Sequence, residues 1–478
     1  MRKYNLYKDS GIEWIGEIPS HWKVERFGYL FSFSRGLGIT KQDLKNEGIP
    51  CVNYGEIHSK YGFALNPEIH QLKFVEESYL ETADKSLLRR GDFVFADTSE
   101  DIEGSGNFTV LDSDIPTFAG YHTVIARHEN DNNYKYLAYC FDSLEFRNQI
   151  RNAVSGIKVY SITQAILKSL KVQLPTFPEQ TAIATYLDSK TVEIDELIAN
   201  KKRLLELYEE EKTAIINKAV TKGLNRRFDG LNDDADANFA PSETSKSRKS
   251  QNQKNQRFRH SGIEWLGEIP EHWEVKRFDY LFDFSRGLPI TKADLRDSGI
   301  PCVSYGEIHS KFGFEVDPNR HLLKCVDEKY LETNDKSLLK SGDFVFADTS
   351  EDLEGSGNFT YLNSSVPTFA GYHTIIGKPI IEFERRYIAY YFNTLSFRNQ
   401  IRSKVTGTKV FSITQAILKF TNIIFPPIYE QQAIVDFIDN ECDRINAKKA
   451  KTKKLIELLT EYRTALISEV VTGKVKVL

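Results

Sequence analysis

The stretch SGIEWIGEIP, residues 10–19, decides the architecture of this chain, because it returns as SGIEWLGEIP at residues 261–270, 251 positions later. The same offset relates PTFAGYHT at 116–123 and SITQAILK at 161–168 to second copies. The copies align without a gap from Ser10 to about Thr221, and roughly seven positions in ten are identical over the first ~115 residues. A repeat this long indicates a duplicated module, because each copy is large enough to hold its own core.

The composition is that of an ordinary globular protein. The chain has 478 residues, 40% hydrophobic and 27% charged, which excludes a wholly disordered protein. The net charge of −4 gives no global positive field that would attract nucleic acid. No apolar run approaches the ~20 residues that span a bilayer, and the N-terminus has no apolar signal segment. Five cysteines without a CxxC pair indicate reduced thiols, so we expect a cytoplasmic protein without membrane contact.

Each copy begins with a globular part for which the sequence predicts an α+β fold. Short runs rich in aromatic and β-branched residues alternate with Gly and Pro, as is typical of strands and turns. In the first copy these runs are FGYLFSFS, PCVNYGEI, DFVFADT and TVIAR, at residues 27–34, 50–57, 92–98 and 123–127. Two short helical patterns fall near residues 134–150 and 163–170. Identity between the copies falls in their later parts.

Each copy ends in a long helical pattern. Apolar residues recur at steps near 3.5 from Pro178, placed as the first helical residue, to Gly223; this stretch of ~44 residues would be ~65 Å long as a helix. A second stripe runs from Pro427 to Gly473. One interpretation is that each helix packs on its own domain. We favour an antiparallel coiled coil that separates two similar domains with pseudo-two-fold symmetry, because helices this long seldom find enough surface on one domain.

The sequence therefore predicts five segments. They are an α+β domain, a long helix, a polar linker, a second α+β domain and a second long helix, at residues 1–175, 176–223, 224–259, 260–425 and 426–473. The linker is rich in Asp, Asn, Ser, Lys and Gln, which is typical of a flexible tether. Its basic part, KSRKSQNQKNQRFR, leaves contact with nucleic acid as an alternative.

A duplicated acidic loop is the strongest candidate for chemistry within the chain. Asp97, Glu100, Asp101 and Glu103 follow a run that we expect to be a buried strand. The carboxylates could serve a metal-dependent nuclease, accept the amino groups of bases, or form a plain polar loop, and the flanking Thr, Ser and Gly residues favour the last two. No zinc spacing, P-loop or Asn/Asp-Pro-Pro-Tyr/Phe methyltransferase motif is present in the sequence. A nearby repeated histidine, His122, is more typical of a structural residue.

Loop residues that recur in both copies are our candidates for contact with DNA. Arg can read guanine with two hydrogen bonds, Asn can read adenine, and Lys and Ser can bind phosphates. Two similar domains on one rod would also match the local two-fold symmetry of duplex DNA. Solvated loop residues are the alternative for each candidate. The candidates are Arg35, Lys41, Tyr54, His58, Lys60, Asn107, Lys158 and Ser161 in the first copy and Arg286, Lys292, Tyr305, His309, Lys311, Asn358, Lys409 and Ser412 in the second.

Several motifs, in the same order in both copies, are typical of one protein family. They are YKDSGIEWIGEIP at residues 7–19, followed by HW, then LP, EQ, AI and LD between 174 and 188, and P, EQ and AI between 427 and 434. In these motifs the chain strongly resembles the specificity subunit of type I restriction–modification systems. The resemblance covers nearly the whole chain except the linker.

The resemblance implies two target-recognition domains and a non-catalytic role in a larger complex. It implies binding to double-stranded DNA, to two methyltransferase subunits and to restriction subunits that can join them. S-adenosylmethionine, ATP and Mg are then expected in the partner subunits, with no cofactor or metal in this chain. The helix residues proposed to bind partners are Leu187, Ile194, Leu204, Tyr208, Ile438, Ile445, Leu455 and Leu459.

The closeness of the two copies departs from the usual family pattern. Family members usually carry dissimilar recognition domains, whereas here the domains are near copies, which implies a near-palindromic target. Two other functions stay open from the sequence. One is a metal-dependent DNA nuclease that uses the acidic loops, and the other is a scaffold that pairs proteins without touching DNA.

Overall fold

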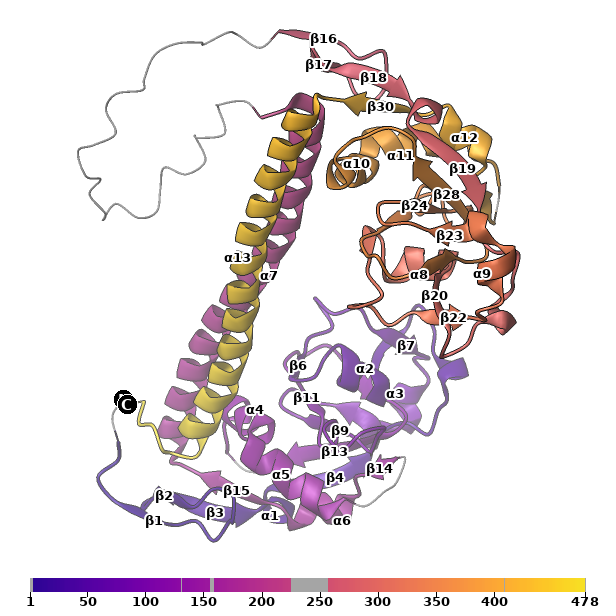
Figure 1. The fold of residues 1–478 in the computed structure, drawn as a ribbon. Coiled ribbons are helices and arrows are strands. Elements are labelled where there is room, and N and C mark those ends of the chain that lie inside the picture. Colours follow the sequence, from indigo (N-terminus) through magenta and orange to yellow (C-terminus); the bar gives the residue numbers. More distant parts are fainter. Residues whose placement is uncertain (1–2, 130, 155–158, 225–256, 408, 478) are drawn as a thin grey trace, which may run out of the picture. The chain divides into compact units, whose positions relative to one another are not determined.

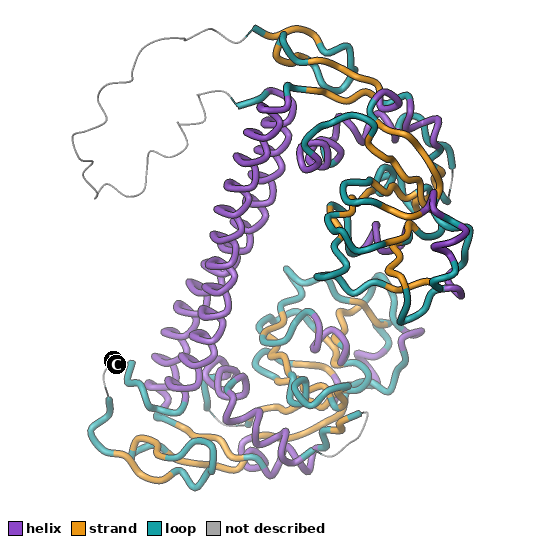
Figure 2. The backbone as a smooth tube through the Cα atoms, in the orientation of Figure 1, coloured by secondary structure: helices purple, strands orange, loops and turns teal. Residues whose placement is uncertain are grey.

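The computed structural model describes residues 3–129, 131–154, 159–224, 257–407 and 409–477. Lys158 and most of the expected linker lie outside these residues. The chain forms two compact units, Met1–Leu204 with Lys451–Leu478, and Leu205–Ala450. Each unit holds one α+β domain of short strands and loops, together with parts of both long helices (Figure 2). None of the described helices is long and apolar enough to cross a lipid bilayer.

The first domain is built on two small sheets (Figure 1). One has the strand order β4-β13-β9-β11-β6 and the other β7-β5-β12-β8, and β9, β11 and β12 are buried throughout. Strands expected near residues 92–98 and 123–127 are confirmed as β9 and β13. The strands are β4 (Phe31–Arg35), β13 (Thr123–His128), β9 (Phe93–Ala96), β11 (Phe108–Leu111), β6 (Ala64–Leu65), β7 (Lys73–Val75), β5 (Ile49–Val52), β12 (Thr117–Ala119) and β8 (Leu87–Leu88).

Short helices and two-stranded ribbons complete the first domain. The ribbons are β1 (Tyr7–Asp9) with β2 (Glu17–Pro19), β3 (Lys23–Arg26) with β15 (Lys171–Leu174), and β10 (Thr98–Ser99) with β14 (Tyr160–Ser161). The helices are α1 (Phe27–Leu30), α2 (Tyr54–Ser59), α3 (Tyr79–Thr82), α4 (Tyr134–Asp142), α5 (Leu144–Ala153) and α6 (Gln164–Ser169), with 3₁₀ turns at η1 (Lys41–Asp43) and η2 (Asp84–Ser86).

Two of the expected strands are partly helical, so those predictions were wrong at their ends. YGEI in the second run begins α2, because Asn53 and Glu56 form a capping box in which the Glu56 carboxylate accepts from the Asn53 backbone N–H at 2.8 Å. FGYL in the first run forms α1, which buries Phe27 and Leu30 on one side. The helical pattern near 134–150 is two helices, since Ser143 ends α4 and caps α5.

The second domain repeats this plan strand for strand. Described residues resume at Arg257 and β16 already begins at Phe258, inside the range expected for the linker. The strands are β19 (Phe282–Arg286), β28 (Thr374–Pro379), β24 (Phe344–Ala347), β26 (Phe359–Leu362), β21 (Glu315–Val316), β22 (Lys324–Val326), β20 (Ile300–Val303), β27 (Thr368–Ala370), β23 (Leu338–Leu339), and the ribbons β16 (Phe258–His260) with β17 (Glu268–Pro270), β18 (Glu274–Arg277) with β30 (Asn422–Phe425), and β25 (Thr349–Ser350) with β29 (Phe411–Ser412). The helices are α8 (Tyr305–Ser310), α9 (Tyr330–Thr333), α10 (Arg385–Phe392), α11 (Leu395–Arg402) and α12 (Gln415–Lys419), with η4 (Phe278–Tyr280), η5 (Lys292–Asp294) and η6 (Asp335–Ser337).

The two long helices are α7 (Phe177–Lys222) and α13 (Ile428–Val471), close to the predicted bounds. α7 starts one residue before Pro178, and the Glu179 carboxylate accepts from the Thr176 backbone N–H and hydroxyl at 3.2 and 2.9 Å. Each helix is followed by a glycine with φ +75°, Gly223 or Gly473. A left-handed residue at this position satisfies the last carbonyls of a helix, so both ends are set locally by the sequence.

The helices run antiparallel against each other, as expected (Figure 1). In the second unit Arg444 of α13 bonds Glu211 of α7 at 3.0 Å, and Lys449 bonds Glu209. In the first unit Arg463 of α13 bonds Asp195 of α7 at 3.0 Å. The alternative of one helix per domain is therefore wrong.

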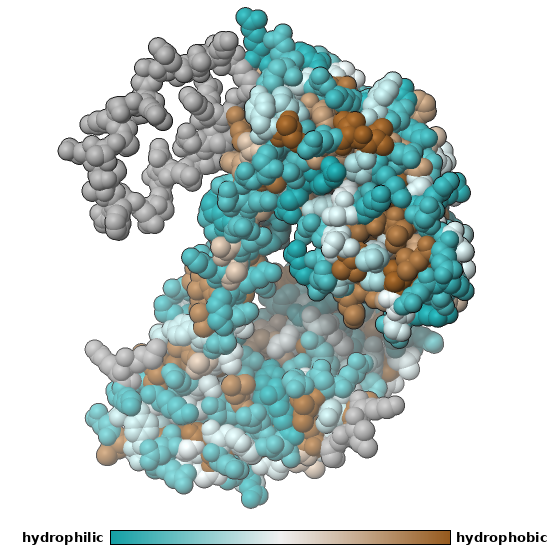
Figure 3. All heavy atoms as spheres, in the orientation of Figure 1, coloured by the Kyte–Doolittle hydropathy of each residue, from teal (hydrophilic) through white to brown (hydrophobic). Residues whose placement is uncertain are grey.

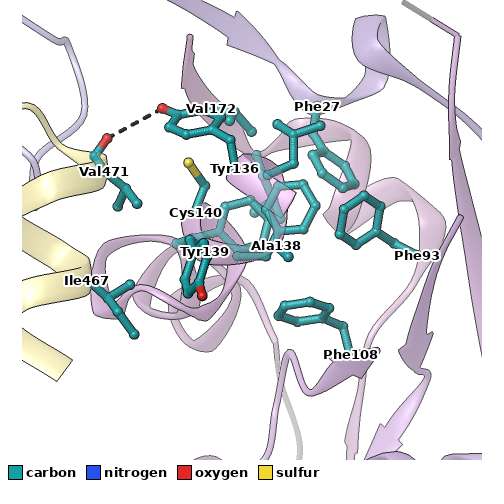
Figure 4. Close-up of a cluster of buried hydrophobic side chains, with 14 of the residues drawn as sticks. Phe27, Phe93, Phe108, Tyr136, Ala138, Tyr139, Cys140, Val172, Ile467 and Val471 are labelled. Atoms are coloured by element: carbon teal, nitrogen blue, oxygen red, sulfur yellow. Dashed lines mark hydrogen bonds between the residues drawn. The ribbon is translucent and has the colours of Figure 1, made fainter. Parts of the chain in front are cut away.

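Each α+β domain also takes up the end of the helix that belongs to the other copy. Ile467 and Val471 of α13 lie in the first core beside Tyr136 and Tyr139 of α4 (Figure 4). The Tyr136 hydroxyl donates to the Val471 carbonyl oxygen at 3.5 Å. In the second unit Val220 of α7 lies in the core in the same way. The core of each unit thus contains residues from both copies. The five consecutive segments predicted from the sequence do not include this exchange.

Candidate nucleic-acid interface

Four segments of the first domain line an open pocket of about 750 Å³. They are α2, the loop that follows β9 and contains β10, the turn before β13, and the residue before β14. All but one of the candidate acidic residues line it, and no lysine or arginine does among the described residues. The lining residues are Tyr54, Gly55, His58, Thr98, Ser99, Glu100, Asp101, Glu103, Gly104, Asn107, His122 and Val159.

A chain of hydrogen bonds holds two of the predicted DNA-binding residues together. His58 Nε2 lies 2.9 Å from the Thr98 carbonyl oxygen and must donate to it, so His58 Nδ1 accepts from Asn107 Nδ2 at 2.9 Å. Asn107 Oδ1 accepts from Arg147 Nη1 at 2.8 Å. The polar atoms of His58 and Asn107 are therefore used inside the domain. These two residues form part of the pocket wall. A direct contact of either side chain with a base would require breaking one of these hydrogen bonds within the domain.

His122 is the most strained residue of the pocket. Its φ of 55° lies in the left-handed region, and its counterpart His373 has φ 54°. Non-glycine residues there are uncommon and persist where the surroundings hold them. The ring is held by Tyr54, at a centroid distance of 5.3 Å, and by Asp97, whose Oδ1 lies 3.2 Å from His122 Nδ1. Sequence reasoning gave His122 a structural role, but its ring is exposed and faces the pocket.

The acidic loop partly bonds to itself. Asp101 Oδ1 accepts from the Gly104 backbone N–H at 2.6 Å, and the Gly104 carbonyl accepts from the Asn107 backbone N–H at 3.0 Å. Glu100 and Glu103 line the pocket without a side-chain hydrogen bond to any described residue. In the part of the chain that the structure describes, no group of three or more His, Cys, Asp or Glu residues is placed to hold a metal ion.

The basic candidates of the first domain lie outside the pocket lining. Arg35 ends β4, Lys41 begins η1 and Lys60 follows α2, and all three are exposed. Their side chains have no hydrogen-bond or ion-pair partner among the described residues, so they are free to meet phosphates. Ser161 is exposed on β14, which pairs with β10 at the pocket edge.

The second domain carries the same constellation. All twelve lining residues of the first pocket have an identical residue 251 positions later, including Tyr305, His309, Asn358 and His373. His309 lies 2.8 Å from the Thr349 carbonyl and 2.8 Å from Asn358 Nδ2. At the edge of this group, burial raises the pKa of the Glu307 carboxyl, the counterpart of Glu56. Four further candidates of this domain are exposed, namely Arg286, Lys292, Lys311 and Lys409, as is Ser412 on β29.

Half of the helix residues proposed to bind partners are buried. Leu187, Ile194, Ile438 and Ile445 are buried within their own units and offer no surface to another chain, because helix and domain contacts cover them. Leu204, Tyr208 and Leu459 are half-buried, and Leu455 is 40% exposed. Some apolar side chains of the helices are exposed, on a surface where hydrophilic and hydrophobic residues are mixed (Figure 3). In the first unit these exposed residues are Val192, Leu197, Leu455, Leu458 and Tyr462.

Sequence reasoning missed the support behind the pocket. Arg147 was assigned only to a helical pattern, although its motif FRNQIR recurs in both copies. The repetition of a charged residue at a half-buried helix position was the signal that could have identified it. Of the exposed apolar helix residues of the first unit, only Leu455 was among the predicted partner-binding residues, because periodicity alone does not separate a stripe that faces another helix from one that faces solvent.

A family model described as type I restriction modification DNA specificity domain matches the chain twice, at residues 19–207 and 270–458. Each match spans one α+β domain and a large part of the helix that follows it, and together they cover well over half of the chain.

Individual relatives have low sequence identity to this chain, but their alignments cover most of its length. The chain is 24% identical over 479 residues to a putative type I restriction enzyme MjaX specificity subunit of Methanocaldococcus jannaschii, covering 97% of this chain and 96% of that protein. It is 22% identical over 344 residues to the MjaVIII specificity subunit of the same organism, covering 71% and 70%. It is 20% identical over 435 residues to the EcoKI specificity subunit of Escherichia coli K12, covering 88% and 82%.

Solved structures share the fold. A chain from a structure that describes complex assembly and conformational transition of the type I R-M system superimposes with a TM-score of 0.65 at 14% identity, covering 96% of this chain and 99% of that one. The HsdS subunit from Thermoanaerobacter tengcongensis gives a TM-score of 0.54 at 14% identity, covering 96% and 98%. The architecture of two similar domains with paired long helices is therefore one that has been seen in solved structures.

Proposed function

Because the chain belongs to the family of type I restriction–modification DNA specificity subunits, we propose that its two domains read two similar, inverted half-sites around a fixed gap. The chain is the recognition subunit of such a complex and not its catalytic one, and it carries no cofactor of its own. It assembles with DNA and with the other subunits, which use S-adenosylmethionine and ATP. This identity leaves no support for the nuclease or for a scaffold that never meets DNA.

The observation that carries the proposal is that all twelve residues lining the pocket have identical counterparts in the second domain. Outer loops differ in chemistry, for example at Ile69 and Arg320, which are counterparts, or at Gln71 and Leu322. Because the same side chains in the same local fold present the same donors and acceptors, the two domains should prefer the same bases.

We assign two kinds of DNA contact to the interface. Exposed Arg35, Lys41 and Lys60, with Arg286 and Lys292 in the second domain, provide positive charge for phosphates or guanine edges. The free Glu100 and Glu103 carboxylates accept amino groups such as cytosine N4 and repel misplaced phosphates. These exposed basic residues would give local positive charge, so that a chain with net charge −4 can bind DNA. Lys158 and Lys409 would add to the phosphate contacts.

The finer composition of the complex also belongs to this proposal. Two methyltransferase subunits would dock on the helix pair, where Val192, Leu197, Leu458 and Tyr462 are exposed. Restriction subunits that depend on ATP and Mg would join them, in the cytoplasm. The domain boundaries at residues 175, 223 and 425 are our assignment for this complex, and the boundary expected at residue 259 moves to before Phe258, where β16 begins. In this assignment the helices set the gap between half-sites.

The test is to map the methylated motif. The chain is co-expressed with its methyltransferase partner in a host without other DNA methylation, and modified adenines are located across the genome. We expect one motif made of two similar half-sites in inverted orientation with a constant spacer. Two unrelated half-sites would contradict the proposal, and a motif without a spacer would contradict the role of the helices.

A further inference from the structure

The pocket of the first domain is tied to the helix pair by side chains. On the pocket side, Arg147 of α5 donates to Asn107 Oδ1 and so fixes the amide that supports His58. Arg147 Nη2 also donates to Asp142 Oδ1, at the end of α4, at 3.0 Å. The two side chains are only 14% and 21% exposed. Charge-assisted bonds between half-buried groups hold their geometry better than surface pairs, so Asp142 fixes the guanidinium.

The helix side of this connection is Arg463 of α13. Its Nη1 lies 3.8 Å from Asp142 Oδ2, and its Nε donates to Asp195 of α7 at 3.0 Å. Arg463 therefore joins both long helices to the carboxylate that holds Arg147. A continuous row of contacts, all within the first unit, runs from the helices through Asp142 and Arg147 to the pocket wall.

In the second domain the contacts next to the pocket counterparts are present, but the contacts that lead from them to the long helices are not. Arg398 donates to Asn358 and, at 2.9 Å, to Asn393 Oδ1. Asn393 stands where the first domain has Asp142, and Lys212 stands where it has Arg463. No hydrogen bond or ion pair joins Asn393 to either long helix among the described residues. Burial, with the nearby Arg402 charge, lowers the pKa of Arg398 to about 10, as expected for a buried guanidinium that lacks a carboxylate.

We propose that Asp142 and Arg463 are positioning residues for the half-site that the first domain reads, and that the second domain reads its half-site without this support. The inference rests on the proposed function. A reading loop that is held from behind cannot shift to accommodate a wrong base pair, whereas a looser loop can adjust and accept it. The two domains then share a base preference and differ in strictness.

The test measures strictness with the complete methyltransferase complex. Methylation rates are compared on three duplexes, namely the mapped target, a duplex with one base pair changed in one half-site, and a duplex with the same change in both. On the singly changed duplex the complex can turn around and place its tolerant second domain on the altered half. The doubly changed duplex forces the first domain onto a wrong base pair as well.

Asp142→Asn copies the residue of the second domain and should fold. We expect it to reduce discrimination against the doubly changed duplex by about tenfold, the usual size of such coupling, and to leave discrimination against the singly changed duplex within about twofold. Arg463→Gln should act in the same direction. The matched control is Arg444→Gln, which breaks an equivalent bond between the helices, to Glu211; no described contact joins Arg444 to the pocket residues or to their counterparts.

The reciprocal change is Asn393→Asp with Lys212→Arg. It should make the second domain stricter and raise discrimination against both changed duplexes. Unaltered discrimination in Asp142→Asn, or an equal loss in Arg444→Gln, would overturn the proposal, and melting temperatures identify general instability. If the mapped motif has unlike half-sites, the proposed target symmetry fails on its own; the base change is then placed in each half separately, and the strictness test still gives an answer.

Discussion

Replacing Ile467 by alanine should destabilise the first unit selectively, although this residue lies near the end of the chain. Ile467 is 2% exposed and packs in the first core among Tyr136, Tyr139 and the other α4 side chains (Figure 4). The second core receives α7 instead, through Ala219 and Val220. A substitution in the last turns of α13 should therefore destabilise the core formed by residues 1–204 and should not destabilise residues 205–450.

The expected size follows from the burial. Truncating a fully buried isoleucine to alanine costs about 2–5 kcal/mol in free energy of unfolding, from lost transfer energy and the cavity left behind. A cost of about 3 kcal/mol raises the opening equilibrium of the first unit about 150-fold. Ile216, the counterpart 251 positions earlier, is half-buried against the second core, so Ile216→Ala should cost less, about 1–2 kcal/mol.

Amide hydrogen exchange of the full chain, read by mass spectrometry, separates the two units because their peptides differ in mass. Ile467→Ala should accelerate exchange in protected strands such as β9 and β13 and leave β24 and β28 unchanged, whereas Ile216→Ala should give the opposite pattern. Leu458→Ala, at a site 48% exposed, serves as the control with little effect. Acceleration of β24 and β28 by Ile467→Ala would refute the exchange of helix ends.

Three further changes test the interface and the rod. His122→Gly relieves the left-handed φ, so the melting temperature should hold or rise while DNA affinity falls about tenfold with loss of the ring, as judged by gel shift of the complex. Arg35→Ala with Arg286→Ala should weaken DNA binding and reduce the slope of log affinity against log salt by about 2, measured by titration at several salt concentrations. Four residues inserted in α7 near Leu204 and in the facing turn of α13 should lengthen the spacer of the methylated motif by about two base pairs, since four residues add about 6 Å. The insertion in α7 alone should reduce activity instead, because it shifts one helix out of register.

The sequence predicted those features that depend on local pattern. The repeat gave the two domains, and apolar periodicity with Gly223 and Gly473 gave helices whose ends agree with the structure within a residue or two. Strands were predicted less well where a helix-capping motif lies inside a β-rich run. The Asn53–Glu56 capping box, for example, starts a helix within such a run. The pocket could not be predicted as a pocket, because it joins four separate segments whose proximity depends on sheet order. For the same reason, the sequence did not predict that His58 and Asn107 bond to each other in the pocket wall, and their contact with DNA stays a prediction.

The exchange of helix ends explains why the copies diverge where they do. Most pocket residues lie in the well-matched first part of each copy, and under the proposed function both sets meet the same kind of half-site. The later part contains α4, α5 and β15, which contact helix ends of different sequence. Gln173 donates to the Val471 carbonyl at 3.0 Å in the first unit, whereas its counterpart Ile424 is buried in the second core. Since each domain must fit a different helix end, its supporting residues are free to differ while its pocket is not, and a difference in strictness between the two readers is the physical consequence.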